Sequence, residues 1–153
     1  MKHIFVIVVF SLVCLGLSAQ TGWFNISFDQ DRGETLAILA EQGFKIEEDK
    51  QERVSFTGST YKGFLSLELW FNAEDRVSSW SIIYDAKASE DFVDDLLDEM
   101  DEMSGFQAIW DENNDTWVWE LENHKGAYLY ELPGDKIRIE YGEFDDSVYD
   151  EWY

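Results

Sequence analysis

Strict alternation of apolar and polar residues marks the best-defined strand of the chain. In the run 64–71, Leu65, Leu67, Leu69 and Phe71 occupy every second position. Successive side chains of a strand point to opposite faces, so this run is predicted to turn one apolar face to a core. Three further runs of strand character are expected around it, at residues 44–48, 53–57 and 77–84.

The segment before these strands combines a strand pattern with a helix pattern. Phe24, Ile26 and Phe28 alternate with polar residues, which predicts a half-buried strand over 24–28. Residues 33–42 are predicted to form a helix, because an acid lies at its start, Gly43 follows its end, and apolar residues share one face. The residues of that face are Leu36, Leu39 and Ala40.

The stretch 90–103 is divided into an apolar side and an acidic side. At 100° per residue, the residues on one side of a helix are Phe92, Val93, Leu96, Leu97, Met100 and Met103. The opposite side carries eight acids, which are Glu90, Asp91, Asp94, Asp95, Asp98, Glu99, Asp101 and Glu102. This pattern predicts an amphipathic helix whose apolar side packs on a core, with Ser89 as its N-cap.

The order of elements is predicted to occur twice. Strands are expected after the second helix at residues 106–110, 116–121, 127–132 and 136–141. Four landmarks recur at offsets of 62, 63, 63 and 60 residues, namely Gly43-Phe44 and Gly105-Phe106, Lys62-Gly63 and Lys125-Gly126, Glu68-Leu69 and Glu131-Leu132, and Asp75-Arg76-Val77 and Asp135-Lys136-Ile137. We therefore predict an α+β fold of two tandem repeats, each a helix with four antiparallel strands, with the helices on one face of the sheet or sheets.

In this order of elements, over about residues 24–141, the chain resembles the small secreted and periplasmic bacterial proteins built from tandem αββββ repeats. The β-lactamase inhibitor protein represents that architecture. No sequence motif carries the resemblance, and the chain lacks a cysteine pair in either half, so no inhibitory residue is transferred to it. What the resemblance implies is a domain that more often binds other proteins than catalyses a reaction.

The N-terminus has the three parts of a secretion signal. Lys2 precedes an apolar run over 4–17, and Ser18-Ala19-Gln20 follows it. A membrane-spanning helix needs about 20 apolar residues, so cleavage after Ala19 is favoured over an uncleaved anchor. The prediction is therefore a signal peptide at 1–19, a single secreted or periplasmic domain at 20–142, and an acidic aromatic tail at 143–153. Within that domain the repeats are placed at about 29–85 and 88–142.

Composition narrows the classes of partner. The chain has 33 acids against 11 lysines and arginines, a net charge of −22 that becomes −23 when Lys2 leaves with the signal. Such a charge repels nucleic acids and anionic membranes and favours basic protein surfaces or cations. The only cysteine, Cys14, lies in the predicted signal, which excludes disulfides and thiol chemistry from the exported domain.

Three sets of residues are candidates for binding. On the second helix, Asp94, Asp98 and Asp101 form an acidic face for a basic partner, and the plainer interpretation is a solvated helix face. Two strands carry aromatic rows that either belong to the core or form a platform for a glycan or a protein. The residues of these rows are Trp117, Trp119, Tyr128 and Tyr130.

The third set follows the spacing of calcium ligands. Asp111, Asn113 and Asp115 place oxygen atoms at alternate positions, as a calcium loop does. The sixth position holds Thr116 instead of the usual glycine, and the twelfth holds Glu122. Because Asn and Asp also favour turns, a simple hairpin turn is the alternative, and no other cofactor is expected.

Catalytic signals are sparse. The predicted mature chain has one histidine, His124, at an expected turn. We therefore predict a non-enzymatic domain that binds another protein. A glycan-binding or calcium-binding accessory domain is the second hypothesis, and a hydrolase is the third.

Overall fold

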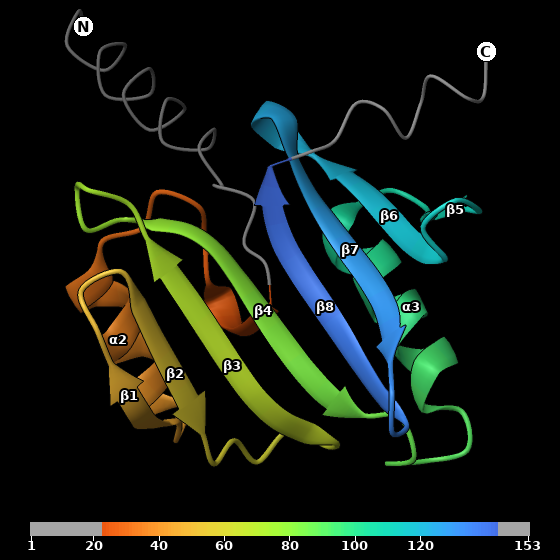
Figure 1. Ribbon diagram of the computed structural model, residues 1–153, viewed down its shortest axis with the longest axis horizontal. Helices are drawn as coiled ribbons and strands as arrows, with labels where there is room; N and C mark the ends of the chain where they lie inside the picture. The colour runs from red at the N-terminus through yellow and green to blue at the C-terminus, as the bar shows by residue number, and fades with distance from the viewer. Residues whose placement is uncertain (1–22, 144–153) are drawn as a thin grey trace, which may run out of the picture.

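The computed structural model describes residues 23–143, so the predicted signal at 1–19 and nearly all of the predicted tail lie outside the described residues. The described part is an α+β fold with two α-helices and one eight-stranded antiparallel sheet (Figure 1). In chain order its elements are η1 (Trp23–Asn25), α2 (Arg32–Glu41), β1 (Lys45–Asp49), β2 (Arg53–Thr57), β3 (Phe64–Phe71), β4 (Val77–Asp85), α3 (Phe92–Ser104), β5 (Ile109–Asp111), β6 (Thr116–Leu121), η2 (Glu122–His124), β7 (Lys125–Leu132) and β8 (Lys136–Glu143).

The strand order is β1-β2-β3-β4-β8-β7-β6-β5, so the last strands of the two halves of the chain lie side by side. Strands β4 and β8 pair antiparallel at the centre, with Trp80 opposite Tyr141 and Ile82 opposite Ile139. Without this pairing, β1–β4 and β5–β8 would form two separate four-stranded sheets. The β4–β8 pair joins them into one continuous sheet.

The core lies between the sheet and the helices. Leu39 of α2 and Leu96 and Met100 of α3 belong to one cluster with alternate residues of β2, β3, β4, β7 and β8. Figure 1 views the sheet with α2 and α3 behind it. One sheet face is thus covered by both helices, and none of the helices described in residues 23–143 covers the other.

The sequence predicted three strands with the bounds that the structure shows, at 53–57, 64–71 and 116–121. Within β3 one position departs from the pattern, since Leu65 is 41% exposed. A register shift between Phe64 and Ser66 interrupts the alternation there. The apolar face of this strand consequently begins at Leu67.

The predicted strand over 24–28 is wrong. Trp23–Asn25 is a short 3-10 turn, and Phe24, Asn25 and Asp29 have φ angles of 63°, 60° and 61°, which no extended strand contains. The apolar side chains serve as anchors instead: the ring of Phe24 packs edge-on against Phe44 at 4.7 Å. The alternation of apolar and polar residues in this segment therefore reflects side chains that anchor the turn to the core, and not a strand paired in the sheet.

Several boundaries in the second half also differ from the prediction, and the starts of α3 and β5 differ for clear physical reasons. Helix α3 begins at Phe92 with Asp91 at its N-cap position, so Ser89 is not the cap, and its hydroxyl has no hydrogen-bond partner in the described part of the chain. Strand β5 starts at Ile109 because the Ser104 hydroxyl bonds with both backbone groups of Phe106, which holds residues 104–106 in a turn.

Candidate functional site

The face of the sheet that α2 and α3 do not cover, which we call the helix-free face, carries the strand side chains that do not point into the core. Because neighbouring residues of a strand point to opposite faces, Trp70, Ser79, Tyr128 and Glu140 face away from the helices. Each adjoins a core residue in sequence: Leu69, Trp80, Ala127 and Tyr141 respectively. The registers connect them across four strands, with Trp70 opposite Ser79 and Tyr128 opposite Glu140.

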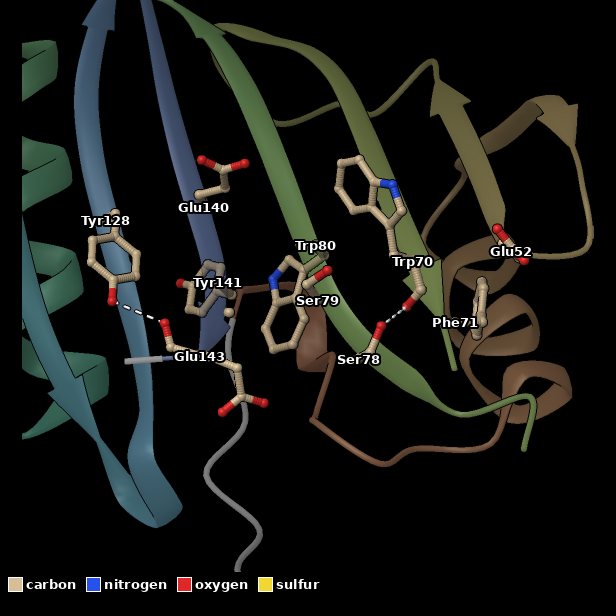
Figure 2. A pocket seen from close by; sticks show the side chains of 11 residues that line it. Glu52, Trp70, Phe71, Ser78, Ser79, Trp80, Tyr128, Glu140, Tyr141 and Glu143 are labelled. Carbon is tan, nitrogen blue, oxygen red and sulfur yellow. Dashed lines mark hydrogen bonds between the residues drawn. The ribbon is translucent and has the colours of Figure 1, made fainter. Parts of the chain in front are cut away.

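A hollow of about 540 Å³ lies on this face, and we call it the central groove. Figure 2 shows Tyr128 and Trp70 on opposite sides of it, with strands β4 and β8 between them. A Cβ atom added to Gly142 would meet nothing within 4 Å, so space is open at that position. The residues that line the central groove are Glu52, Trp70, Phe71, Ser78, Ser79, Trp80, Tyr128, Glu140, Tyr141, Gly142 and Glu143.

The charge of the central groove is negative. Three of its lining residues are glutamates, and none is a lysine or an arginine. Glu143 pairs with Lys125, whereas Glu52 and Glu140 make no ion pair within residues 23–143. The central groove therefore holds carboxylates whose charge is not balanced by a bonded cation.

Glu140 is held in place by a tyrosine. It accepts a hydrogen bond from the Tyr130 hydroxyl. Burial raises the pKa of Tyr130, and the bond to Glu140 raises it further. The Arg138 guanidinium approaches the same hydroxyl at 3.5 Å, so that arginine is directed to Tyr130. This arrangement fixes the Glu140 carboxylate beside the central groove.

A second hollow continues from the first, and we call it the lateral groove. Its volume is about 460 Å³, and it shares Tyr128, Glu140 and Glu143 with the central groove. Its other lining residues are Asp111, Asn114, Thr116 and Tyr130. The two grooves therefore lie side by side and share part of their lining.

The structure separates the four aromatic candidates. Tyr128 and Tyr130 lie half-buried on the helix-free face and line these grooves. Trp119 is 0% exposed and Trp117 packs against the core, so the interpretation of these tryptophans as an outward platform is wrong. The alternation of β6 places both on the side of α3.

The three acidic candidates on α3 also divide. Asp94 and Asp98 are exposed on its outer side. Asp101 is half-buried, and its Oδ1 accepts hydrogen bonds from the Trp119 indole nitrogen at 2.7 Å and from the Ala108 amide at 2.9 Å. Asp101 thus joins the helix to β6 and is not part of a free acidic face, because its carboxylate is already engaged.

Replacing Asp101 by alanine should lower the free energy of unfolding by about 2 kcal/mol, since it leaves the indole nitrogen of the buried Trp119 and the Ala108 amide without an acceptor. Asp98→Ala, on the exposed side of the same helix, should change it by less than about 0.5 kcal/mol. Urea unfolding followed by tryptophan fluorescence measures both. Equal losses in the two variants would show that the Asp101 contacts contribute nothing.

The calcium candidates form a hairpin turn. One oxygen of Asp111 accepts from the amides of Asn113 at 3.0 Å and Asn114 at 3.4 Å, and the other accepts from the Asn114 side chain at 2.7 Å. Asp115 follows in the left-handed region with a φ of 54°. Over residues 23–143, these residues and His124 join no cluster of three or more potential metal ligands.

Sequence reasoning missed Trp70, Glu52, Glu140 and Gly142. For the three strand residues, the available signal was the set of positions that alternate with the core positions and so occupy the opposite face. Glu52 lies before β2, so strand alternation gives no signal for it. Trp70 lies within the apolar run of β3, where the prediction used only the alternating core positions Leu65, Leu67, Leu69 and Phe71.

Comparisons of the chain with protein-family models, with curated proteins and with solved structures find no match. In the part of the chain that the structure describes, neither α-helix has the length and apolar character needed to cross a membrane.

Proposed function

We propose that the chain is an exported, non-enzymatic domain that binds a basic segment of another protein in the central groove. One observation carries this proposal: the helix-free face contains a hollow lined by Glu52, Glu140 and Glu143 and by no basic side chain. The net charge of −22 favours the same class of partner over nucleic acids and anionic membranes.

The chemistry of the walls supports a protein partner. Trp70 and Tyr128 place large amphipathic rings on either side of the central groove. Tryptophan and tyrosine are enriched among the residues that dominate binding energy at protein interfaces. The carboxylates would supply orientation and faster association, and the rings would supply buried area.

A glycan is the second candidate ligand, since an aromatic ring that lines an open hollow can stack on a sugar. Trp70 and Tyr128 both meet that requirement. Salt separates the candidates, because binding of a basic protein weakens as ionic strength rises, whereas stacking on a neutral sugar changes little.

We also propose that the two halves arose by duplication. Each half has a helix followed by four strands, and Gly43 and Gly105 follow the two helices with φ angles of 89° and 72°. Asp75 and Asp135 occupy the turns before β4 and β8 with φ angles of 61° and 56°. Equivalent backbone at equivalent places supports a common origin for the halves.

The central groove can be filled to test the proposed binding. Gly142→Trp should reduce capture of a basic partner from the native envelope or medium by about 100-fold, the loss expected when a central contact region is blocked. Thr60→Trp is the matched control, because it adds the same side chain to an exposed loop that precedes β3. Capture is quantified by mass spectrometry at low and moderate salt.

Loss of one basic protein with Gly142→Trp and its retention with Thr60→Trp is the expected result. Proteins captured equally by both variants would count against the central groove as the binding site. If the protein lost with Gly142→Trp is acidic, the charge argument is wrong.

A further inference from the structure

The two grooves together define the shape of an occupant. They extend from Glu52, which precedes β2, to Asp111 at the end of β5. Between these strands lie six interstrand intervals of about 4.8 Å, which make about 29 Å. An extended peptide advances about 3.3 Å per residue, so about nine residues cover that distance.

The best-defined polar group, Glu140, lies where the two grooves meet. Glu140 lines both grooves and lies opposite Tyr128 on one side and Ser81 on the other. The sheet surface is not covered by large side chains here, because the neighbouring residues are small: Ser79, Ser81 and Gly142. A long side chain can therefore reach Glu140 along the surface of the sheet.

The charges favour a cation at that position. Glu140 makes no ion pair in the described residues, and its hydrogen bond from Tyr130 holds it in one place. Neither arginine of the same face forms an ion pair with Glu140 in the described residues, since Arg53 pairs with Glu48 and Glu68 and Arg138 approaches the Tyr130 hydroxyl. The Arg138 charge lies close enough to act on Glu140 but leaves the carboxylate without a bonded cation. A lysine or arginine brought by a ligand would meet a fixed carboxylate with the Tyr128 ring beside it on β7 and the Trp70 ring two strands away on β3. Aromatic rings favour cations through their faces.

We propose that the occupant is an extended basic segment of the partner protein that lies across the strands, with one lysine or arginine side chain held at Glu140 between Tyr128 and Trp70. This inference rests on the proposed function. It adds the conformation of the bound segment, its length of about nine residues, and the residue that receives its central cation.

A defined peptide tests this inference without knowledge of the partner. The probe is a fluorescein-labelled nonapeptide of alternating arginine and serine, and the same peptide with glutamate in place of arginine is the charge-reversed control. Fluorescence anisotropy is measured with the predicted mature chain, residues 20–153. Glu140→Gln should weaken binding of the arginine peptide about tenfold, because it removes one charge-assisted contact and keeps the acceptor for Tyr130.

Asp98→Asn is the matched variant, since it removes the same charge from the exposed side of α3. It should change the affinity by less than about twofold, as expected for an exposed and screened charge. Equal effects of the two variants, or equal binding of both peptides, would overturn the inference. If the arginine peptide does not bind while Gly142→Trp still abolishes capture of the partner, the inference fails and the proposed function stands.

Discussion

Replacement of Trp80 by alanine is expected to lower the free energy of unfolding by about 3–5 kcal/mol, the range for removing a buried tryptophan side chain. Trp80 is 0% exposed, stacks on Tyr141 with 4.5 Å between ring centroids, and packs against Phe28 at 4.7 Å. The Trp80–Tyr141 stack lies across the β4–β8 pair, where the two halves of the sheet join. The cavity would therefore open at the centre of the molecule.

Trp80→Phe is the informative control. The indole nitrogen of Trp80 is buried and has no hydrogen-bond partner within residues 23–143. Phenylalanine removes that unsatisfied donor, which costs about 1–3 kcal/mol where it stands, and this gain offsets part of the lost packing. We expect a loss of less than about 1.5 kcal/mol for Trp80→Phe. Guanidinium unfolding followed by circular dichroism measures both variants, and equal losses would contradict this account of Trp80.

Much of the sheet was predictable because one buried face imposes a period of two on each strand. The bounds of β2, β3 and β6 were predicted correctly, and the buried positions of β3 alternate from Leu67 onward as that period requires. The amphipathic pattern of α3 was equally informative, and Phe92, Leu96 and Met100 are buried as predicted. Where side-chain anchoring replaced strand pairing, as at Phe24, the same pattern was misleading.

The candidate site could not be predicted from periodicity. The central groove combines Trp70 of β3, Ser79 of β4, Glu140 of β8 and Tyr128 of β7, and only the pairing of β4 with β8 brings the two halves together. The alternation of a strand predicts which face of the sheet a residue occupies, but it does not predict which strand lies next to it. The role of Asp101 was hidden for a related reason, because its partner Trp119 lies on another element.

The buried tyrosines of the core make stability sensitive to alkaline pH. Burial raises the pKa of Tyr84, and the nearby Tyr141 raises it further. Burial also raises the pKa of Tyr141, whose hydroxyl donates to the sulfur of Met100 at 3.2 Å. Both phenols therefore stay protonated in the folded chain at a pH where they ionise in the unfolded chain.

The direction of the pH dependence follows from this difference. Below about pH 10, the ordinary tyrosine pKa, both states hold the protons and the two tyrosines make no pH-dependent contribution. Above it the unfolded chain releases them first, so the free energy of unfolding should fall by about 1.4 kcal/mol per pH unit for each tyrosine. Urea unfolding at pH 7, 9, 10 and 11 should show this fall. The fall should be smaller in Tyr84→Phe and smallest in the double variant Tyr84→Phe/Tyr141→Phe.

At pH 7, Tyr84→Phe should be as stable as the original chain or more stable, because the Tyr84 hydroxyl is buried without a partner in residues 23–143. An unchanged slope in the double variant would show that other groups cause the alkaline loss.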